Sequence, residues 1–255
     1  MNLDLDFETL KGFLDEKYEK FNNPNFIEDD PIQIPHLFNK KEDIEISGFI
    51  TSTIAWGKRN SIIKSAKKFI DLMDNSPYEF VISHSAKDLK RFENAVHRTF
   101  NGEDLKFFII SLKNIYENYG GLENILTKTD NIFNNLSDLH KIFFSIPHLQ
   151  RTKRHLANVE SGSAAKRLNM FLRWMIRKDN RGVDFGIWKN ISSADLYIPL
   201  DVHSGRIARL LGLLERKQND WKAVDLLTKQ LRKFDSKDPV KYDFALFGIG
   251  VNEDF

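Results

Sequence analysis

Along most of the chain, apolar residues recur every three or four positions and are separated by polar ones, a spacing typical of amphipathic helices. In segment 60–73 the apolar positions 62, 66, 69, 70 and 73 fall on one helical face. No stretch alternates with the period of two that strands require. The pattern therefore predicts an all-α fold. We expect helices at 60–73, 104–121, 137–146, 163–178, 203–217, 220–234 and 241–250, and a buried apolar segment at 44–57.

Polar residues, glycines and prolines mark the expected helix ends. Asn60 and Asp104 are placed to cap helix starts, and Gly120-Gly121 is a typical stop. Segment 24–35 contains three prolines, which break any long helix there. We expect this segment to cover a surface rather than to separate independent domains.

Composition narrows the class of protein. The 255 residues are 41% hydrophobic and include no cysteine, which excludes a disulfide framework, a thiol nucleophile and a thiolate metal site. No apolar run reaches 18 residues and the first ten residues are acidic, so we expect neither a membrane partner nor a signal peptide. The seven histidines lack metal-ligand spacing, and no glycine-rich nucleotide motif is present. We therefore expect a cytoplasmic protein without a metal or cofactor.

Charge is distributed unevenly along the chain. Residues 1–30 hold nine acidic and three basic residues, whereas residues 151–181 hold nine basic and two acidic ones. A basic block within an aromatic-rich folded region is typical of a polyanion binder, although a solvated helix face gives the same count. The candidate phosphate contacts in this block are Arg151, Lys153, Arg154 and Arg167.

The stretch IPLDVHSGRIARLLGLL (198–214) contains the first candidate catalytic group. Asp201 follows Pro199 and stands where its carboxylate caps the next helix, and the positive end of that helix keeps the carboxylate ionised. Capping alone explains this residue; the second possibility is an acid in an active site. His203 is a candidate acid–base or substrate-binding group, but two residues past a cap it is also placed to bond the backbone.

The second candidate is Lys166, at the start of the predicted helix 163–178. It shares a stripe with Met170, Arg173 and Arg177, at spacings of four, three and four residues. The approach VESGSA (159–164) brings Gly162 and Ser163 to the helix start, where backbone amides suit a phosphate. The positive helix end disfavours a charged lysine, and a neutral amine is a nucleophile. A surface or phosphate-binding lysine is the alternative.

Together these segments resemble the helix-hairpin-helix (HhH-GPD) DNA glycosylase superfamily. PLDVHSGRIARLLGL (199–213) follows its pattern of an aspartate, a histidine two residues later, spaced arginines and a Gly-Leu pair. The 35-residue interval from Lys166 to Asp201 resembles the archaeal AGOG-type 8-oxoguanine DNA glycosylase/lyase. Two features depart from the superfamily: Lys166 follows Gly162 by four residues rather than two, and Trp56 stands near where many members have glutamine. The whole chain also resembles a bacterial family known as a domain of unknown function (DUF2400-like), on the strings 166–188 and 238–250.

The superfamily resemblance implies a two-lobed helical fold with a cleft between the lobes. Residues 43–195 would form a helical barrel lobe with a hairpin-like segment, and residues 1–42 plus 196–255 the second lobe. It further implies that a damaged base, such as an oxidised purine, is flipped out of double-stranded DNA. We expect the protein to be a monomer. Lys166 would form a Schiff base with the sugar, and Asp201 would stabilise the positive charge that develops.

A flipped base needs an aromatic face and polar contacts. The candidates are Trp56, Trp188, Phe244 and Phe247 for stacking, and Asp243 for hydrogen bonding. Each aromatic residue has core packing as its alternative, and Trp174 is expected in the core.

Two other functions remain open: a non-catalytic DNA-structure-binding protein on the same scaffold, and an all-α protein–protein adaptor. Convergence of Lys166 and Asp201 on one site favours the enzyme, and an exposed lysine that points away favours the binder.

Overall fold

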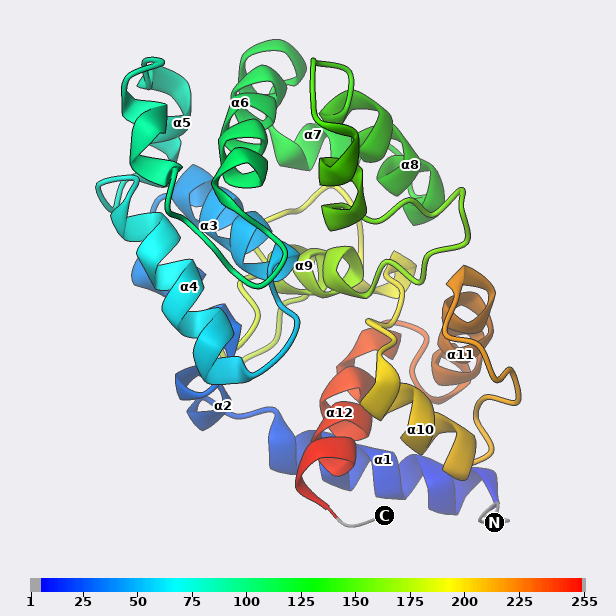
Figure 1. Cartoon of the computed structure of the whole chain (residues 1–255). Helices are drawn as coiled ribbons and strands as arrows, with labels where there is room; N and C mark the ends of the chain where they lie inside the picture. Colours follow the sequence, from blue (N-terminus) through cyan, green and yellow to red (C-terminus); the bar gives the residue numbers. More distant parts are fainter. Residues whose placement is uncertain (1–5, 254–255) are drawn as a thin grey trace. The chain divides into compact units, whose positions relative to one another are not determined.

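The computed structural model describes residues 6–253, and within them it contains helices and no strand. The predicted all-α class is confirmed (Figure 1). The α-helices are α1 (Phe7–Phe21), α2 (Asn25–Glu28), α3 (Lys41–Thr53), α4 (Arg59–Asp71), α5 (Pro77–Ser83), α6 (Gly102–Tyr119), α7 (Leu122–Leu126), α8 (Ile132–Phe143), α9 (Lys166–Ile176), α10 (Val202–Leu210), α11 (Trp221–Phe234) and α12 (Tyr242–Asn252). The 3₁₀ turns are η1 (Pro31–Gln33), η2 (Pro35–Leu37), η3 (Asp88–Phe92), η4 (Gln150–His155), η5 (Ser193–Asp195) and η6 (Pro239–Lys241).

The helix ends differ in detail from those expected. Asn101, not Asp104, caps α6, and Asp104 is the third residue of a capping box that returns a bond to the Asn101 amide. Helix α4 starts at Arg59, one residue before the expected cap. Gly120 ends α6 with φ 74°, as a glycine stop predicts. The proline-rich segment forms only α2, η1 and η2, each a single turn.

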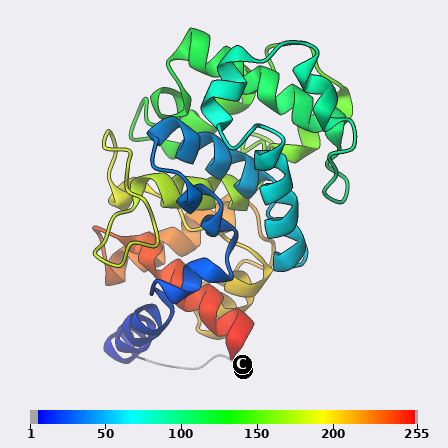
Figure 2. The ribbon, with the colours of Figure 1, turned by 90° about the vertical axis from the view of Figure 1, so that its left-hand side faces the viewer.

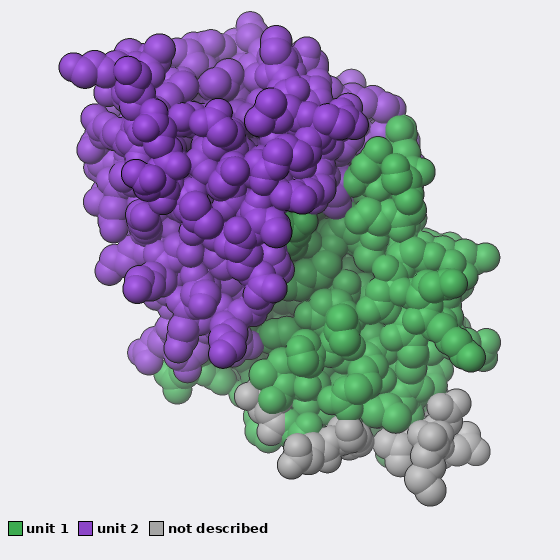
Figure 3. Space-filling view, viewed as in Figure 1, with its two compact units in different colours: residues 1–26, 158–255 green, residues 27–157 purple. Residues whose placement is uncertain are grey.

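The described chain divides into two compact units, coloured separately in Figure 3. Unit 1 contains residues up to 26 and from 158 onward, and unit 2 contains residues 27–157. The expected boundaries at 42/43 and 195/196 differ from these. Helix α9 and the loop before it lie in unit 1, because the loop bonds the start of α11: the Gly162 carbonyl accepts from the Trp221 amide at 3.0 Å.

Unit 2 is built around an aromatic core. Helix α3 is buried on nearly all sides, as the apolar segment 44–57 predicts. Phe49 of α3 packs on Phe108 of α6 and Phe143 of α8, with ring centroids 6.2 and 5.7 Å apart. Phe108 and Phe143 are themselves 4.7 Å apart. These contacts join three helices that are distant in sequence.

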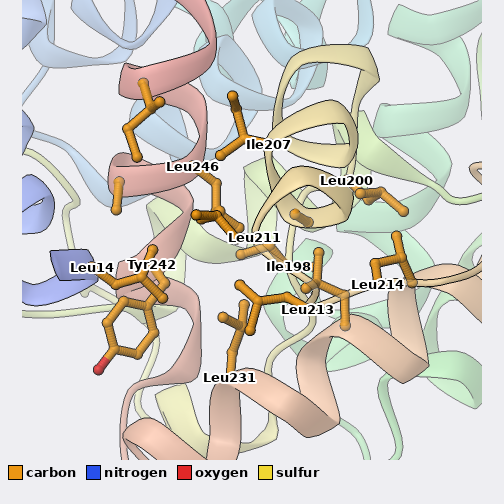
Figure 4. Packing of buried hydrophobic residues seen from close by; sticks show 14 of the residues in the cluster. Leu14, Ile198, Leu200, Ile207, Leu211, Leu213, Leu214, Leu231, Tyr242 and Leu246 are labelled. Atoms are coloured by element: carbon orange, nitrogen blue, oxygen red, sulfur yellow. The ribbon is translucent and has the colours of Figure 1, made fainter. Parts of the chain in front are cut away.

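Unit 1 has an aliphatic core between α1, α10, α11 and α12, and Figure 4 shows its side chains pointing toward one another. Helix α12 lies alongside both α1 and α10 (Figure 1). Leu14 of α1, Ile207 of α10 and Leu246 of α12 are fully buried. Helix α1 was not expected from the pattern; Asp6 caps it and its buried positions are Leu10 and Leu14.

No helix within residues 6–253 combines the length and the apolar character that crossing a bilayer requires.

Candidate functional site

Asp201 caps α10 with one carboxylate oxygen and leaves the other uncommitted. Its Oδ1 accepts from the Ser204 amide at 2.9 Å and from the Ser204 hydroxyl at 3.1 Å. The Ser204 hydroxyl in turn accepts from the Asp201 amide at 3.0 Å, which closes a capping box. Within residues 6–253, Asp201 Oδ2 accepts no hydrogen bond. The half-buried carboxylate therefore holds the helix start and still offers one oxygen to a ligand.

Lys166 is the first residue of α9, and an unusual backbone conformation leads into it. Ala165 caps the helix with φ 47° and ψ 36°, in the left-handed region that alanine seldom adopts. The Ser163 hydroxyl accepts from the Ala165 amide at 3.2 Å and supports this turn. Lys166 Nζ lies 3.5 Å from Met170 Sδ, and no ion pair joins the half-buried ammonium to any residue of the described chain. The amine is thus close to a soft apolar group and not neutralised by a carboxylate.

Asp243, in the first turn of α12, is a buried carboxylate that both candidates act upon. Arg173 of α9 pairs with it directly through Nη1. Burial raises the pKa of Asp243 to about 6; Arg173 and Lys166 lower it, whereas the negative charge of Asp201 raises it. Lys166 and Asp201 are therefore both close enough to Asp243 for their charges to affect its protonation. We call Lys166, Asp201 and Asp243 the Asp243 cluster.

Arg173 connects the Asp243 cluster to a buried network of ion pairs that also contains Arg177. The Asp184 carboxylate bridges the two guanidinium groups, at 3.2 Å from Arg173 Nε and 3.0 Å from Arg177 Nη1. Arg177 is fully buried and also pairs with Asp179 at 2.8 Å and Asp238 at 2.9 Å. Burial by itself lowers the pKa of Arg177, but the carboxylates outweigh it and raise the pKa. Of the predicted stripe, Lys166, Met170 and Arg173 lie on α9 and Arg177 is its C-cap residue. The two arginines are buried ion-pair partners rather than solvated charges.

His203 and Phe247 lie beside the start of α10. The His203 Nδ1 atom is 3.2 Å from the Gly250 carbonyl oxygen. His203 therefore makes the backbone hydrogen bond that was expected as the alternative to an acid–base or substrate-binding role. Phe247 of α12 is half-buried, and its ring lies edge-on to the imidazole with centroids 6.2 Å apart. A Cβ on Gly250 would approach the His203 Cβ to 3.0 Å, so the glycine permits the close packing of α10 on α12.

Two of the aromatic candidates lie in the core. Trp188 is 1% exposed and packs edge-on against Phe171. Phe244 is 2% exposed, and the Arg173 guanidinium lies over its ring at 4.2 Å, a cation–π contact. Trp174 is fully buried, as expected. Because protein atoms cover Trp188 and Phe244, neither ring has a face open to a base, and the core alternative applies to both.

The loop before α9 and the first turn of this helix contain three candidate DNA contacts, Gly162, Ser163 and Arg167. Gly162 is exposed with φ 82°, and Ser163 forms an isolated bridge with Asp220. Arg167 is half-buried, and burial lowers its pKa to about 10. No side chain caps the first turn of α9.

The remaining candidates belong to unit 2. Arg151 pairs with the buried Asp104 at 2.9 Å and donates to the Thr99 carbonyl at 2.9 Å, so it supports the start of α6. Arg154 is exposed and donates to the same carbonyl at 3.3 Å. Lys153 is half-buried and makes no ion pair with the residues described. Trp56 is half-buried and stacks on His155, with centroids 6.0 Å apart.

Unit 1 also contains a groove that was not predicted from the sequence. Val202, Arg206, Arg209 and Leu210 of α10 line an open groove of about 620 Å³ together with Lys217 and Asn219, and Leu210 also packs against the core of unit 1. We call this groove the α10 groove. Their spacing of four, three and one residues is a helical period that the sequence displays, since residues 204, 205, 207 and 208 between them are buried. No group of three or more histidine, aspartate or glutamate side chains in residues 6–253 is arranged to hold a metal ion.

Comparison with known proteins gives a family but no function. Residues 30–252 match the family described as protein of unknown function DUF2400. The chain belongs to the DUF2400 family. The match includes every residue of the Asp243 cluster and of the α10 groove, and it begins after α1. No curated protein and no solved structure matches the chain.

Proposed function

We propose that this protein is a DNA glycosylase with an AP-lyase activity, which removes a damaged base, an oxidised purine such as 8-oxoguanine, from double-stranded DNA. The observation that carries the proposal is the Asp243 cluster. An amine without an ion pair and a carboxylate with a free oxygen both act electrostatically on one buried acid. The resemblance of segment 199–213 to the helix-hairpin-helix glycosylases supports the same chemistry. We expect the protein to act as a monomer in the cytoplasm.

Lys166 would be the nucleophile. Its ammonium first gives a proton to a carboxylate of the cluster, and the neutral amine then attacks C1′ of the everted nucleoside. The bond from C1′ to the base breaks with its electron pair on the base, which takes up a proton as it leaves. The C1′–O4′ bond then breaks with its electron pair on O4′, which takes the second amine proton, and the opened sugar is left as a protonated imine of Lys166. Removal of a C2′ proton then expels the 3′ phosphate oxygen, and water releases the lysine.

Asp201 would stabilise the positive charge that develops on the sugar as the base leaves. The capping bonds fix its carboxylate, so no reorganisation is needed when that charge appears. The half-buried Phe247 ring and the adjacent His203 are candidates for contacts to the base. Lys153, Arg154, Gly162, Ser163 and Arg167 are the candidate contacts to the DNA backbone.

Borohydride trapping tests this chemistry, because borohydride reduces the imine to a stable secondary amine. A panel of duplexes is used, each with one damaged base or an abasic site, and base release and strand nicking are measured in parallel. We expect a covalent protein–DNA adduct with at least one duplex, and no adduct with Lys166→Gln. Lys178→Gln is the matched control, since Lys178 is an exposed lysine two residues beyond the end of α9.

A non-catalytic DNA-structure-binding protein is the second candidate. It is favoured by the spacing of Gly162 and Lys166, which departs from that of catalytic hairpins, and by the contact of Lys166 with Met170. This candidate predicts salt-sensitive DNA binding with no base release and no adduct on any duplex of the panel.

A further inference from the structure

The α10 groove starts at the residue that follows Asp201 and runs along the exposed face of the helix. Val202, the first residue of α10, is 75% exposed, although an apolar side chain gains nothing from contact with water. From Val202 to Leu210 the helix rises about 12 Å, at about 1.5 Å per residue. The loop after α10 closes the groove with Lys217 and Asn219.

The cationic side chains of the groove include two that no carboxylate neutralises. Within residues 6–253, Arg209 and Lys217 form no ion pair, and the lining contains no acidic residue. Arg209 is nevertheless fixed in place, because its Nε donates to the Arg216 carbonyl at 2.8 Å and its Nη2 to Asn219 Oδ1 at 2.6 Å. Neutral acceptors hold the guanidinium without cancelling its charge, which is the arrangement that an anionic ligand requires.

The groove is also joined to the candidate catalytic acid. Asn219 Nδ2 donates to the Asp201 carbonyl at 2.9 Å, so one side chain connects Arg209 to the backbone of the α10 cap. An extended ligand in the groove is thereby placed in register with Asp201.

We infer that the α10 groove binds the phosphodiester backbone of the DNA strand that leads to Asp201. This inference rests on the proposed function. Each strand of a duplex carries one phosphate per about 3.4 Å of helix axis, so a length of about 12 Å allows more than one phosphate to reach the cations. The apolar Val202 and Leu210 suit the sugar and base faces of a strand, whereas a free phosphate would make no use of them.

Two substitutions in the groove test the inference by equilibrium binding to an undamaged duplex, measured over a range of salt concentrations. Lys217→Gln removes one cation. Val202→Glu adds a negative charge at a helix start, where it favours folding. We expect each variant to bind about fivefold to tenfold more weakly than the wild type near 0.1 M salt, and Lys217→Gln to lower the slope of log K against log salt by about 1.

Lys233→Gln is the matched control, because Lys233 is an exposed lysine of α11 outside the groove. Thermal melting verifies that the variants are folded. If the wild type binds the duplex and both groove variants bind it with the same affinity, the inference is overturned and the glycosylase proposal stays in place. Absence of DNA binding by the wild type would instead remove the proposed function.

Discussion

Burial brings the pKa of the Asp243 carboxyl group close to physiological pH. Its pKa of about 6, raised by burial from an ordinary 3.8, leaves it mostly ionised at pH 7 and able to accept a proton near that pH. In the proposed reaction it is suited to receive the proton of Lys166, whose charge acts on it.

Substitution of Asp243 should therefore change the pH dependence of the proposed reaction. The rate of the wild type should fall as the pH decreases through about 6, because protonation removes the accepting carboxylate and its pairing with Arg173. Asp243→Asn should lower single-turnover base release by about 100-fold and abolish this acidic limb. Asp225→Asn, in an exposed ion pair of α11, should leave both the rate and the limb unchanged. An unaltered pH profile in Asp243→Asn would show that the buried acid is structural only.

At the scale of single helices, the turn into α9 stores backbone strain. Ala165 adopts the left-handed region, which costs an L-residue with a Cβ about 1–2 kcal/mol. Part of this cost disappears when glycine takes its place, although glycine also loses more entropy on folding.

Ala165→Gly should consequently stabilise the protein by about 0.5–1 kcal/mol and raise the melting temperature by about 1–4 °C. Ala208→Gly, within α10 and with no such backbone constraint, should lower it instead. The two variants are compared by thermal unfolding. A lower melting temperature for Ala165→Gly would mean that the turn is not strained.

The helices could largely be predicted from sequence, and the site only in part. Periodicity located α4, α6, α9 and α11, because each buries one apolar stripe, and α12 was located as well although it is buried on nearly all sides. Helix α1 was missed because its fully buried face is narrow. Asp201 was predicted correctly as a cap, since capping depends on neighbours three residues away. The pairing of Arg173 with Asp243 was not predictable, because the two residues lie 70 positions apart and no local signal relates them.

At the scale of unit 1, the network around Arg177 connects three parts of the chain. The Arg177 guanidinium donates to the Tyr18 hydroxyl of α1 at 2.9 Å and pairs with Asp184 and Asp238 from later segments. Removing one member of a buried network leaves the others as uncompensated charges, which costs more than the network contributes when complete.

Arg177→Met should therefore destabilise the protein by about 3–5 kcal/mol. Arg181→Met, at a position four residues after Arg177, breaks a solvent-accessible pair with Glu19 and should cost less than about 1 kcal/mol. Urea denaturation of both variants measures the difference. Similar losses for the two arginines would indicate that solvent screens the Arg177 network more than its burial implies.

Helix α1 has a consequence for the synthesis of this protein. Its partner in the fold is α12, yet residues 7–21 leave the ribosome long before residues 242–252. At about 5–20 residues per second the interval is roughly 10–40 s. The whole of unit 2 emerges in that time, while Leu10 and Leu14 have no surface to cover them. The nascent chain thus presents a short apolar stripe that a holding chaperone could bind, and unit 1 closes only when α12 has been made.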